Sequence, residues 1–309
     1  MTEATRSPFQ RQGVLVALCL VILIAVLAGC VWLVGFPGRA GLPADPLFSG
    51  EEAYEHVLAQ MNLGPRTVGS AAHAQAGEYI VKQLEATGWE VEVQEFEYDG
   101  VQLRNFIGRA AVGQGPVVIV GAHYDSRRHA DQDQAEPLAP VPGANDGASG
   151  VAVLLELARA LDRDGLTNEV WLAFFDAEDD GGIDGWPWII GSTHMAQSLT
   201  VEPAYVVVVD MIGDADQQMY LDFNSDAELA GRIWSLAASL GYGEHFIPVP
   251  RYSMLDDHTP FAQLGIPAVD VIDFDYPYWH TTADTADKVS AASLERVGRT
   301  VEVLLEGDS

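Results

Sequence analysis

Cysteine is nearly absent from this 309-residue chain. The two copies, Cys19 and Cys30, both lie in one apolar stretch near the N-terminus. The rest of the chain therefore has no disulfide and no thiolate that could bind a metal. Any metal held there must be bound by His, Asp and Glu side chains.

Basic residues are also scarce, with 16 Lys and Arg against 45 Asp and Glu and a formal net charge of −29. Such a surface repels nucleic acid and anionic lipid headgroups, and it mildly attracts cationic substrates. We therefore expect no nucleic-acid partner. The strong negative charge also favours a monomer.

Several catalytic signatures are missing as well. The sequence contains no HExxH motif, no GxSxG motif, no Walker-type phosphate loop and no candidate Cys nucleophile. A serine hydrolase assembled from Ser126, Asp257 and His258 has no support in the surrounding turn chemistry. These absences leave a metal site built from nitrogen and oxygen ligands as the main candidate.

One uncharged apolar segment, residues 13–35, is long enough to cross a bilayer as a helix. Arg6 and Arg11 precede it, so the positive-inside rule predicts that residues 1–12 stay in the cytoplasm. The remainder is then extracytoplasmic and tethered to the cell membrane by a single-pass anchor. Residues 36–50 are rich in Pro and Gly and are typical of a linker, which leaves residues 51–309 as one domain.

The end of the apolar segment allows a second interpretation. Leu27-Ala28-Gly29-Cys30 resembles a bacterial lipobox, in which the signal is cleaved and Cys30 is lipidated. Because the apolar run continues to Val34, we favour the uncleaved anchor. A diacylglyceryl group on Cys30, detected by mass spectrometry, would establish the lipoprotein instead.

The pattern of apolar segments in this domain predicts an α/β fold. From Pro116 onward, short apolar runs alternate with helical segments, which indicates a largely parallel sheet covered on both faces. We predict a single three-layer α/β/α domain with a mixed, mainly parallel sheet. The predicted strands are 89–98, 105–112, 117–121, 170–175, 205–209 and 268–272, and the predicted helices are 51–63, 71–87, 147–161, 189–199, 227–240 and 291–305.

The strand at 170–175 ends in four closely spaced carboxylates, Asp176, Glu178, Asp179 and Asp180. Such carboxylates repel one another unless a cation or strong hydrogen-bond donors separate them. In isolation this stretch would be an ordinary solvated acidic turn. Ligands of open α/β sheets, however, bind beyond the carboxyl ends of the strands, and other strand ends here carry similar residues.

Four more segments supply residues that bind metals. His123 closes one apolar run, and Asp125 is placed to accept its other ring N–H. A loop at 127–142, acidic and Pro-rich, leads to Asp146 within GANDGASG, which alone could be a helix N-cap. Asp210 ends an all-Val strand and His280 follows the last strand. Two imidazoles with several carboxylates suit zinc.

This ordered series of motifs, from His123-x-Asp125 to His280 in HTTADTADKV, resembles the M28 family of zinc aminopeptidases and its relative, glutaminyl cyclase. The likeness covers residues 51–305 and implies a zinc exopeptidase-like fold with one or two Zn²⁺ ions. Carried over, it implies that Glu178 is the general base and that peptide N-termini are the substrate. The implied metal ligands are His123 and Asp210 for one zinc, Asp179 and His280 for the other, and Asp146 for both.

One position departs from the family pattern, because the ligand position held here by Asp179 is commonly Glu. An Asp side chain is one methylene shorter. Either the loop must therefore come closer to the metal, or Asp180 must replace Asp179.

The resemblance leaves the reaction open. The HTTADTADKV ending and the compact loops are similar to bacterial aminopeptidases, so we expect hydrolysis, in which Glu178 activates a water. The alternative is conversion of N-terminal Gln to pyroglutamate, with Glu178 moving the proton. The third is an inactive membrane-tethered binding domain, against which the presence of Glu178 argues.

Three features favour the cyclase alternative: Trp279 directly before His280, the doubled acid before His258, and the tryptophan loop at 186–188. Tryptophans more often serve in packing. In the cyclase interpretation Asp256 shares the hydrogen-bond network of Glu178. The residues expected to line the substrate pocket are Trp279, Trp186, Asp257 and His258.

Overall fold

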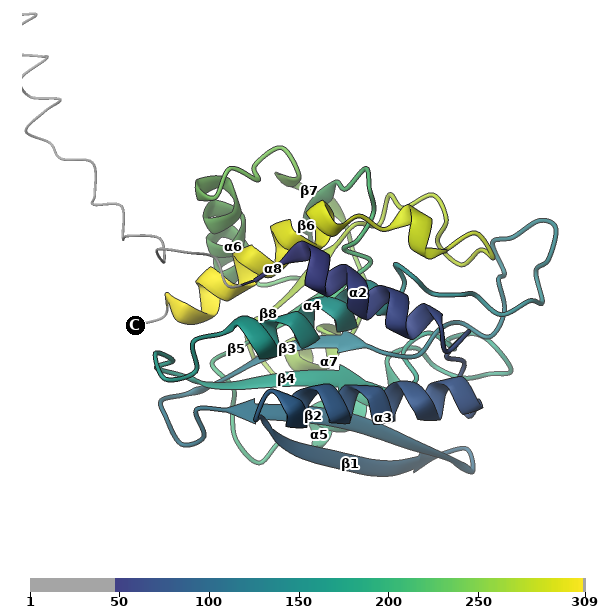
Figure 1. Ribbon diagram of the computed structural model, residues 1–309, viewed down its shortest axis with the longest axis horizontal. Coiled ribbons are helices and arrows are strands. Elements are labelled where there is room, and N and C mark those ends of the chain that lie inside the picture. Colours follow the sequence, from purple (N-terminus) through teal and green to yellow (C-terminus); the bar gives the residue numbers. More distant parts are fainter. Residues whose placement is uncertain (1–47, 308–309) are drawn as a thin grey trace, which may run out of the picture. The chain divides into compact units, whose positions relative to one another are not determined.

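A six-stranded mixed sheet forms the centre of the structure, a computed structural model that describes residues 48–307. The strand order is β1-β2-β4-β3-β5-β8, and the last four strands run parallel (Figure 1). Strand β2 is antiparallel to both β1 and β4, and β1 forms an edge. The bounds are β1 Glu90–Tyr98, β2 Val101–Ala110, β3 Val117–His123, β4 Glu169–Phe175, β5 Tyr205–Asp210 and β8 Ala268–Ile272.

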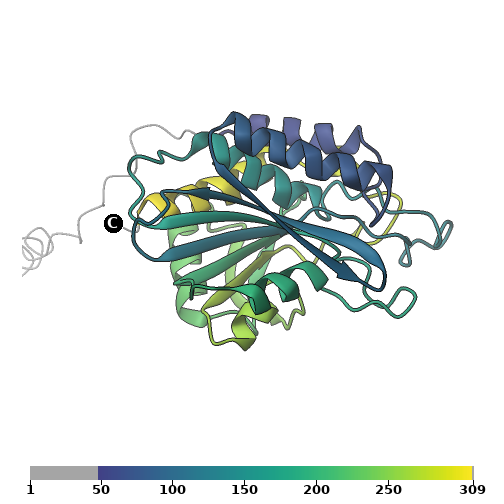
Figure 2. The same cartoon turned by 90° about the horizontal axis from the view of Figure 1, so that it is seen from below.

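Helices cover both faces of the sheet, as Figure 2 shows. Side chains alternate along β3, so Val118 and Val120 pack into the larger core while Val117 and Ile119 pack into the smaller one. The larger core lies beneath α2 (Gly50–Met61), α3 (Ala71–Ala86), α4 (Ala148–Ala160) and α8 (Ala291–Glu306). The smaller core is covered by α5 (Ile190–Ser198) and α7 (Thr259–Gln263).

A second, two-stranded parallel sheet pairs β6 (Met219–Asp222) with β7 (Phe246–Tyr252), next to α6 (Ala227–Ser239). Neither strand was predicted, and α7 and the short 3₁₀ helix η1 (Ala286–Lys288) were missed too. Strand β6 has only 4 residues. Strand β7 contains Pro248 and Pro250, which cannot donate to a ladder and argue against a strand in the sequence.

The predicted α/β architecture with a mixed, mainly parallel sheet is confirmed. The main differences lie at the ends of elements. Strand β2 begins at Val101, four residues before the prediction, and β3 and β5 run on to His123 and Asp210. Both of these polar side chains are therefore fixed by strand backbone rather than by a loop.

The predicted cytoplasmic segment 1–12 and anchor 13–35 lie outside the described residues, so the anchor and the membrane location remain predictions. Within residues 48–307, no helix is both long and apolar enough to cross a bilayer. The predicted linker ends too late. Phe48 is buried, its N–H donates to Glu302 Oε1 at 3.1 Å, and α2 begins at Gly50.

Candidate metal centre and active site

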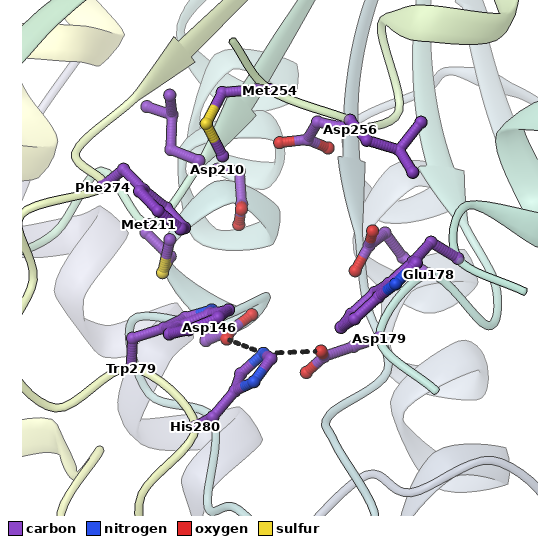
Figure 3. A pocket seen from close by; sticks show the side chains of 13 residues that line it. Asp146, Glu178, Asp179, Asp210, Met211, Met254, Asp256, Phe274, Trp279 and His280 are labelled. Atoms are coloured by element: carbon purple, nitrogen blue, oxygen red, sulfur yellow. Dashed lines mark ion pairs between the residues drawn. The ribbon is translucent and has the colours of Figure 1, made fainter. Parts of the chain in front are cut away.

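The polar residues expected at the site gather at the carboxyl end of the parallel strands (Figure 3). His123 and Asp210 are the last residues of β3 and β5. Asp146 lies two residues before α4. Glu178 and Asp179 follow β4, and His280 follows β8. The sheet thus brings together side chains that are far apart in the sequence.

The five predicted ligands form two groups of three that share Asp146. In the first group, His123 Nε2 lies 3.2 Å from Asp146 Oδ1 and 3.2 Å from Asp210 Oδ1. In the second, His280 Nε2 lies 3.7 Å from Asp146 Oδ2 and 3.0 Å from Asp179 Oδ1. One ligand atom from each residue of a group lies within 4.8 Å of the others. Each oxygen of Asp146 therefore faces a different group. We call His123, Asp146 and Asp210 the first half-site, and Asp146, Asp179 and His280 the second half-site.

The donor set fits zinc. All five side chains are buried, and Asp146 Oδ2 and Asp179 Oδ2 have no hydrogen-bond partner. Burying an unpaired carboxylate oxygen is costly, and a divalent cation would supply the missing partner. Imidazole nitrogen and carboxylate oxygen are common zinc ligands. His123, Asp146 and Asp210 would hold one ion, and Asp146, Asp179 and His280 would hold a second.

The short side chain of Asp179 does reach the site, as its 3.0 Å approach to His280 shows. Asp180 does not replace it, because its Oδ2 pairs with Arg128 Nε at 2.9 Å. Asp176 also points elsewhere, since Oδ1 lies 2.7 Å from His73 Nε2 and Oδ2 accepts from the Tyr124 hydroxyl. Of the four clustered carboxylates, only Glu178 and Asp179 face the site.

Unusual backbone conformations coincide with the site. Three non-glycine residues here have positive φ: Ala177 (51°), Met211 (46°) and His280 (55°). They lie directly before Glu178, directly after Asp210, and at a predicted ligand. The left-handed conformation costs roughly 1–2 kcal/mol per non-glycine residue. Such strain persists only where surrounding contacts over-determine it, and it concentrates at functional sites.

Gly147, directly before α4, lies where a larger residue would clash with His123 and Asp125. Its φ is +88°, and a Cβ there would lie 3.0 Å from His123 Cε1 and 2.7 Å from the Asp125 carbonyl oxygen. The glycine therefore lets the turn after Asp146 pack against the His123 ring.

Asp125 holds three residues of the site in place: His123, Glu178 and Asp179. It is fully buried, its Oδ1 lies 3.4 Å from His123 Nδ1, and its two oxygens accept the backbone N–H groups of Glu178 and Asp179 at 3.1 Å each. Burial opposes the ionised form, but His123 and the N–H of Asp179 outweigh it and lower the pKa of Asp125. Asp125 thus supports both a predicted ligand and the predicted base, without lining the pocket.

Burial dominates the electrostatics of the acids in the site. It raises the pKa of Glu178 well above its usual range, with His123 opposing and Asp257 adding to the rise. Burial together with neighbouring carboxylates raises the pKa of Asp179 and that of Asp210 to about 7. Without a bound cation, Asp179 and Asp210 are therefore partly protonated at neutral pH.

We expect zinc affinity to fall as the pH is lowered through about 7. Asp179 and Asp210 have raised pKa values of about 7 in the metal-free protein, so below that pH they are mainly protonated. A zinc ion must then displace their protons, which compete with it. Chelator-competition titrations between acidic and mildly alkaline pH measure the effect. Affinity that rises on acidification would contradict it.

A small pocket of about 200 Å³ opens over the metal-ligand cluster. Ligand sites for drug-sized molecules usually enclose about 300–1,000 Å³, so this one suits a single terminal residue. In Figure 3, Glu178 and Asp256 lie on one side and Trp279, Phe274 and Met211 on the other. The remaining lining residues are Asp146, Asp179, Trp188, Asp210, Met254, Leu255, Ile272 and His280.

Three predicted pocket residues do not line this pocket. Trp186 instead packs edge-on against Tyr98, with Arg128 over its ring at 5.0 Å. Asp257 is fully buried behind Asp256, whose carboxylate accepts its N–H. His258 is also fully buried; its Nε2 lies 3.3 Å from Asp222 Oδ2 and its Nδ1 4.0 Å from Asp270 Oδ2.

Other residues of the site were missed by sequence reasoning. Trp188 lines the pocket where Trp186 was expected, and the sequence Trp-Pro-Trp offers no signal to choose between them. Asp131 lies 3.2 Å from His280 Nδ1, and Arg127 binds Asp131. Both belong to the acidic, Pro-rich loop 127–142, in which the sequence predicts no site residue.

Comparison with known proteins agrees with this geometry. Residues 105–305 match the model of peptidase family M28. A solved glutaminyl cyclase from Porphyromonas gingivalis is 33% identical, with a TM-score of 0.81, covering 86% of this chain and 100% of that one. A leucine aminopeptidase precursor from Bacteroides thetaiotaomicron is 30% identical, with a TM-score of 0.81 and coverage of 87% and 99%. A glutaminyl-peptide cyclotransferase from Boiga dendrophila is 25% identical, covering 89% of this chain and 93% of its own.

Proposed function

We propose that this chain, which belongs to peptidase family M28, is a zinc-dependent glutaminyl-peptide cyclotransferase. Such an enzyme converts an N-terminal glutamine to pyroglutamate. The wall of the pocket carries this proposal. Of its 13 lining residues, 7 are apolar, and among these are Trp188, Phe274 and Trp279. Ring closure uses the substrate's own amine, and water is a competitor, so a small pocket with a partly apolar wall favours cyclisation over hydrolysis.

The relatives support the same choice. Similar proteins from Boiga dendrophila and from Drosophila melanogaster, the latter 26% identical over 76% of this chain, are glutaminyl-peptide cyclotransferases. Solved glutaminyl cyclases from Porphyromonas gingivalis and Tannerella forsythia have the same fold at 31–33% identity. This proposal departs from the expectation from sequence, which placed hydrolysis first.

The proposed reaction balances without water. The α-amine nitrogen attacks the side-chain amide carbon Cδ, the N–Cδ bond forms, the Cδ–Nε bond breaks, and ammonia leaves. The proton released by the amine must reach the departing nitrogen. Glu178 lies in the pocket wall, and its raised pKa suits a group that takes a proton and returns it.

The other residues of the pocket bind and orient the substrate in this proposal. Asp256 lies on the same side of the pocket as Glu178 and can accept a hydrogen bond from the substrate's N-terminal amine (Figure 3). Trp279 stacks on His280 at 3.8 Å between ring centroids and forms an apolar wall against the flat amide. Zinc held by Asp146, Asp179 and His280 would polarise the amide carbonyl as a Lewis acid.

An aminopeptidase is the second candidate, and the paired half-sites favour it. Both ligand groups are complete and share Asp146. Two-metal sites of this kind occur in aminopeptidases, where the metals stabilise the attacking and leaving groups. The similarity to the leucine aminopeptidase precursor of Bacteroides thetaiotaomicron supports the same candidate.

Two assays in heavy-oxygen water separate the candidates. With a Gln-initiated peptide, the cyclotransferase releases ammonia, leaves the chain length unchanged and incorporates no heavy oxygen. An aminopeptidase releases the first residue and incorporates one heavy oxygen into it. Release of amino acids from aminoacyl nitroanilides without ammonia from Gln peptides would overturn the proposal. Inactivity in both assays, with zinc confirmed by elemental analysis, would favour a binding domain.

A further inference from the structure

The two predicted histidine ligands are supported in different ways. His123 Nδ1 lies 3.4 Å from Asp125, a fully buried carboxylate that two backbone N–H groups hold in place. His280 Nδ1 lies 3.2 Å from Asp131, whose side chain is 42% exposed on the loop 127–142. Carboxylates beside a ligating histidine orient its ring and raise its basicity. The second half-site therefore depends on a surface loop.

Three consecutive residues of this loop hold the turn that carries His280. Asp131 lies against the ring, and the Gln132 N–H donates to the His280 carbonyl oxygen at 3.2 Å. Asp133 Oδ2 accepts the Thr282 N–H at 3.1 Å and also its hydroxyl. His280 has a φ of 55°, a strained conformation for this residue. These loop contacts offset the strain and fix the direction of the ring.

Arg127 joins the loop to the rest of the same half-site. Its guanidinium, nearly buried, binds Asp131 with two hydrogen bonds, Nε to Oδ1 at 3.1 Å and Nη2 to Oδ2 at 2.6 Å. Nη1 donates to the Asp179 carbonyl oxygen at 2.7 Å, and Nη2 donates to that of Gly181 at 3.2 Å. The same group lies over the Trp188 ring at 4.7 Å. One side chain thus fixes the partner of His280 and the loop of Asp179.

We propose that Arg127 and Asp131 are a positioning pair that sets the geometry and metal affinity of the Asp179–His280 half-site separately from the His123–Asp210 half-site. The proposal rests on zinc binding at the cluster, as the proposed function does, but not on which reaction follows. Among the described residues, no hydrogen bond or ion pair joins either member of the pair to His123 or Asp210. Loss of the pair should therefore weaken one zinc and spare the other.

The reason for a large effect lies in the geometry of the guanidinium. Two parallel hydrogen bonds from Arg127 hold the Asp131 carboxylate in one orientation, and a lysine cannot reproduce this fork. Replacing the partner of a metal-ligating histidine typically costs about 10–100-fold in metal affinity. Because Asp131 is partly exposed, its removal leaves no large cavity, and the variant should fold.

The test is a zinc titration of metal-free protein against a chromophoric chelator, with no substrate present. We expect Asp131→Ala to weaken one zinc about 10–100-fold and to leave the other within a factor of two to three of the unsubstituted protein. Asp125→Asn should weaken the zinc of the His123–Asp210 half-site, because it removes the carboxylate beside His123. Glu136→Ala is the matched control, because it removes one carboxylate from the same loop at an exposed position. It should change neither zinc.

Arg127→Lys separates orientation from charge. It keeps the positive charge but loses the paired hydrogen bonds, so the affinity of the same zinc should fall in the direction seen for Asp131→Ala. Equal weakening of both zincs by Asp131→Ala, or unchanged binding in both variants, would overturn the proposal. If the protein binds one zinc, that zinc must respond to Asp131→Ala, or the proposal fails. A failure of the cyclase assay leaves these outcomes unaffected.

Discussion

Replacing Glu178 with Gln is expected to lower turnover by about 10²–10⁴-fold while leaving the zinc content unchanged. Gln has nearly the same shape but can neither take nor return a proton at neutral pH. Glu178 lines the pocket and is not a member of either ligand group. Its loss should therefore remove proton transfer without removing a metal ligand. The measurements are kcat on a Gln-initiated peptide and zinc by elemental analysis.

The matched control for this prediction is Glu202→Gln. Glu202 is exposed and lies in the segment before β5, away from the pocket lining, so the same chemical change there should leave kcat unaffected. Thermal unfolding of both variants checks that the fold is intact. A Glu178→Gln protein that keeps full zinc and full turnover would show that another group moves the proton.

Removing zinc should abolish activity and lower the midpoint of thermal unfolding. Asp146 and Asp179 each bury an oxygen that has no hydrogen-bond partner, so the metal-free fold carries an electrostatic cost. A ligand present at 1,000 times its Kd stabilises the native state by about 4 kcal/mol. For a domain of this size, each kcal/mol shifts the midpoint by roughly 2–4 °C. We therefore expect a fall of roughly 8–16 °C after chelation.

Reversal by added zinc, monitored by thermal unfolding and activity together, is the control for this prediction. A variant that lacks the shared ligand, Asp146→Asn, should respond much less to the chelator, because both half-sites lose a charged oxygen. A midpoint of the unsubstituted protein that stays the same with and without chelator would contradict the assignment. So would full activity after the zinc has been removed.

Much of the fold could be predicted because its signals are local. The strands at 117–123, 169–175, 205–210 and 268–272 are mainly apolar, and short apolar runs of this kind are typical of strands buried on both faces. Strand β7 was missed because its own sequence carries no local signal for a strand. Its stability comes from pairing with β6 and not from its own composition, since it holds two prolines and is mostly exposed.

The sequence could place the candidate ligands in one site because parallel strands all end at one edge of a sheet, while their division between two zinc ions came from the family resemblance. Once five strand or loop ends each carried a His or an acid, their convergence followed from the topology. The choice among neighbouring residues did not follow. Asp179 and not Asp180 reaches His280, and this depends on Arg128 holding Asp180 at 2.9 Å.

By itself, the sequence determined the α/β architecture and the set of side chains that meet at the edge of the sheet, because periodicity and strand order are encoded locally. Only the tertiary structure decided which loop residues face inward. Trp188 lines the pocket while Trp186 packs against Tyr98, His258 is buried, and Asp131 lies against His280. The physical reason is that loops take their conformation from contacts with distant segments, such as those of Arg127, and no local pattern records these contacts.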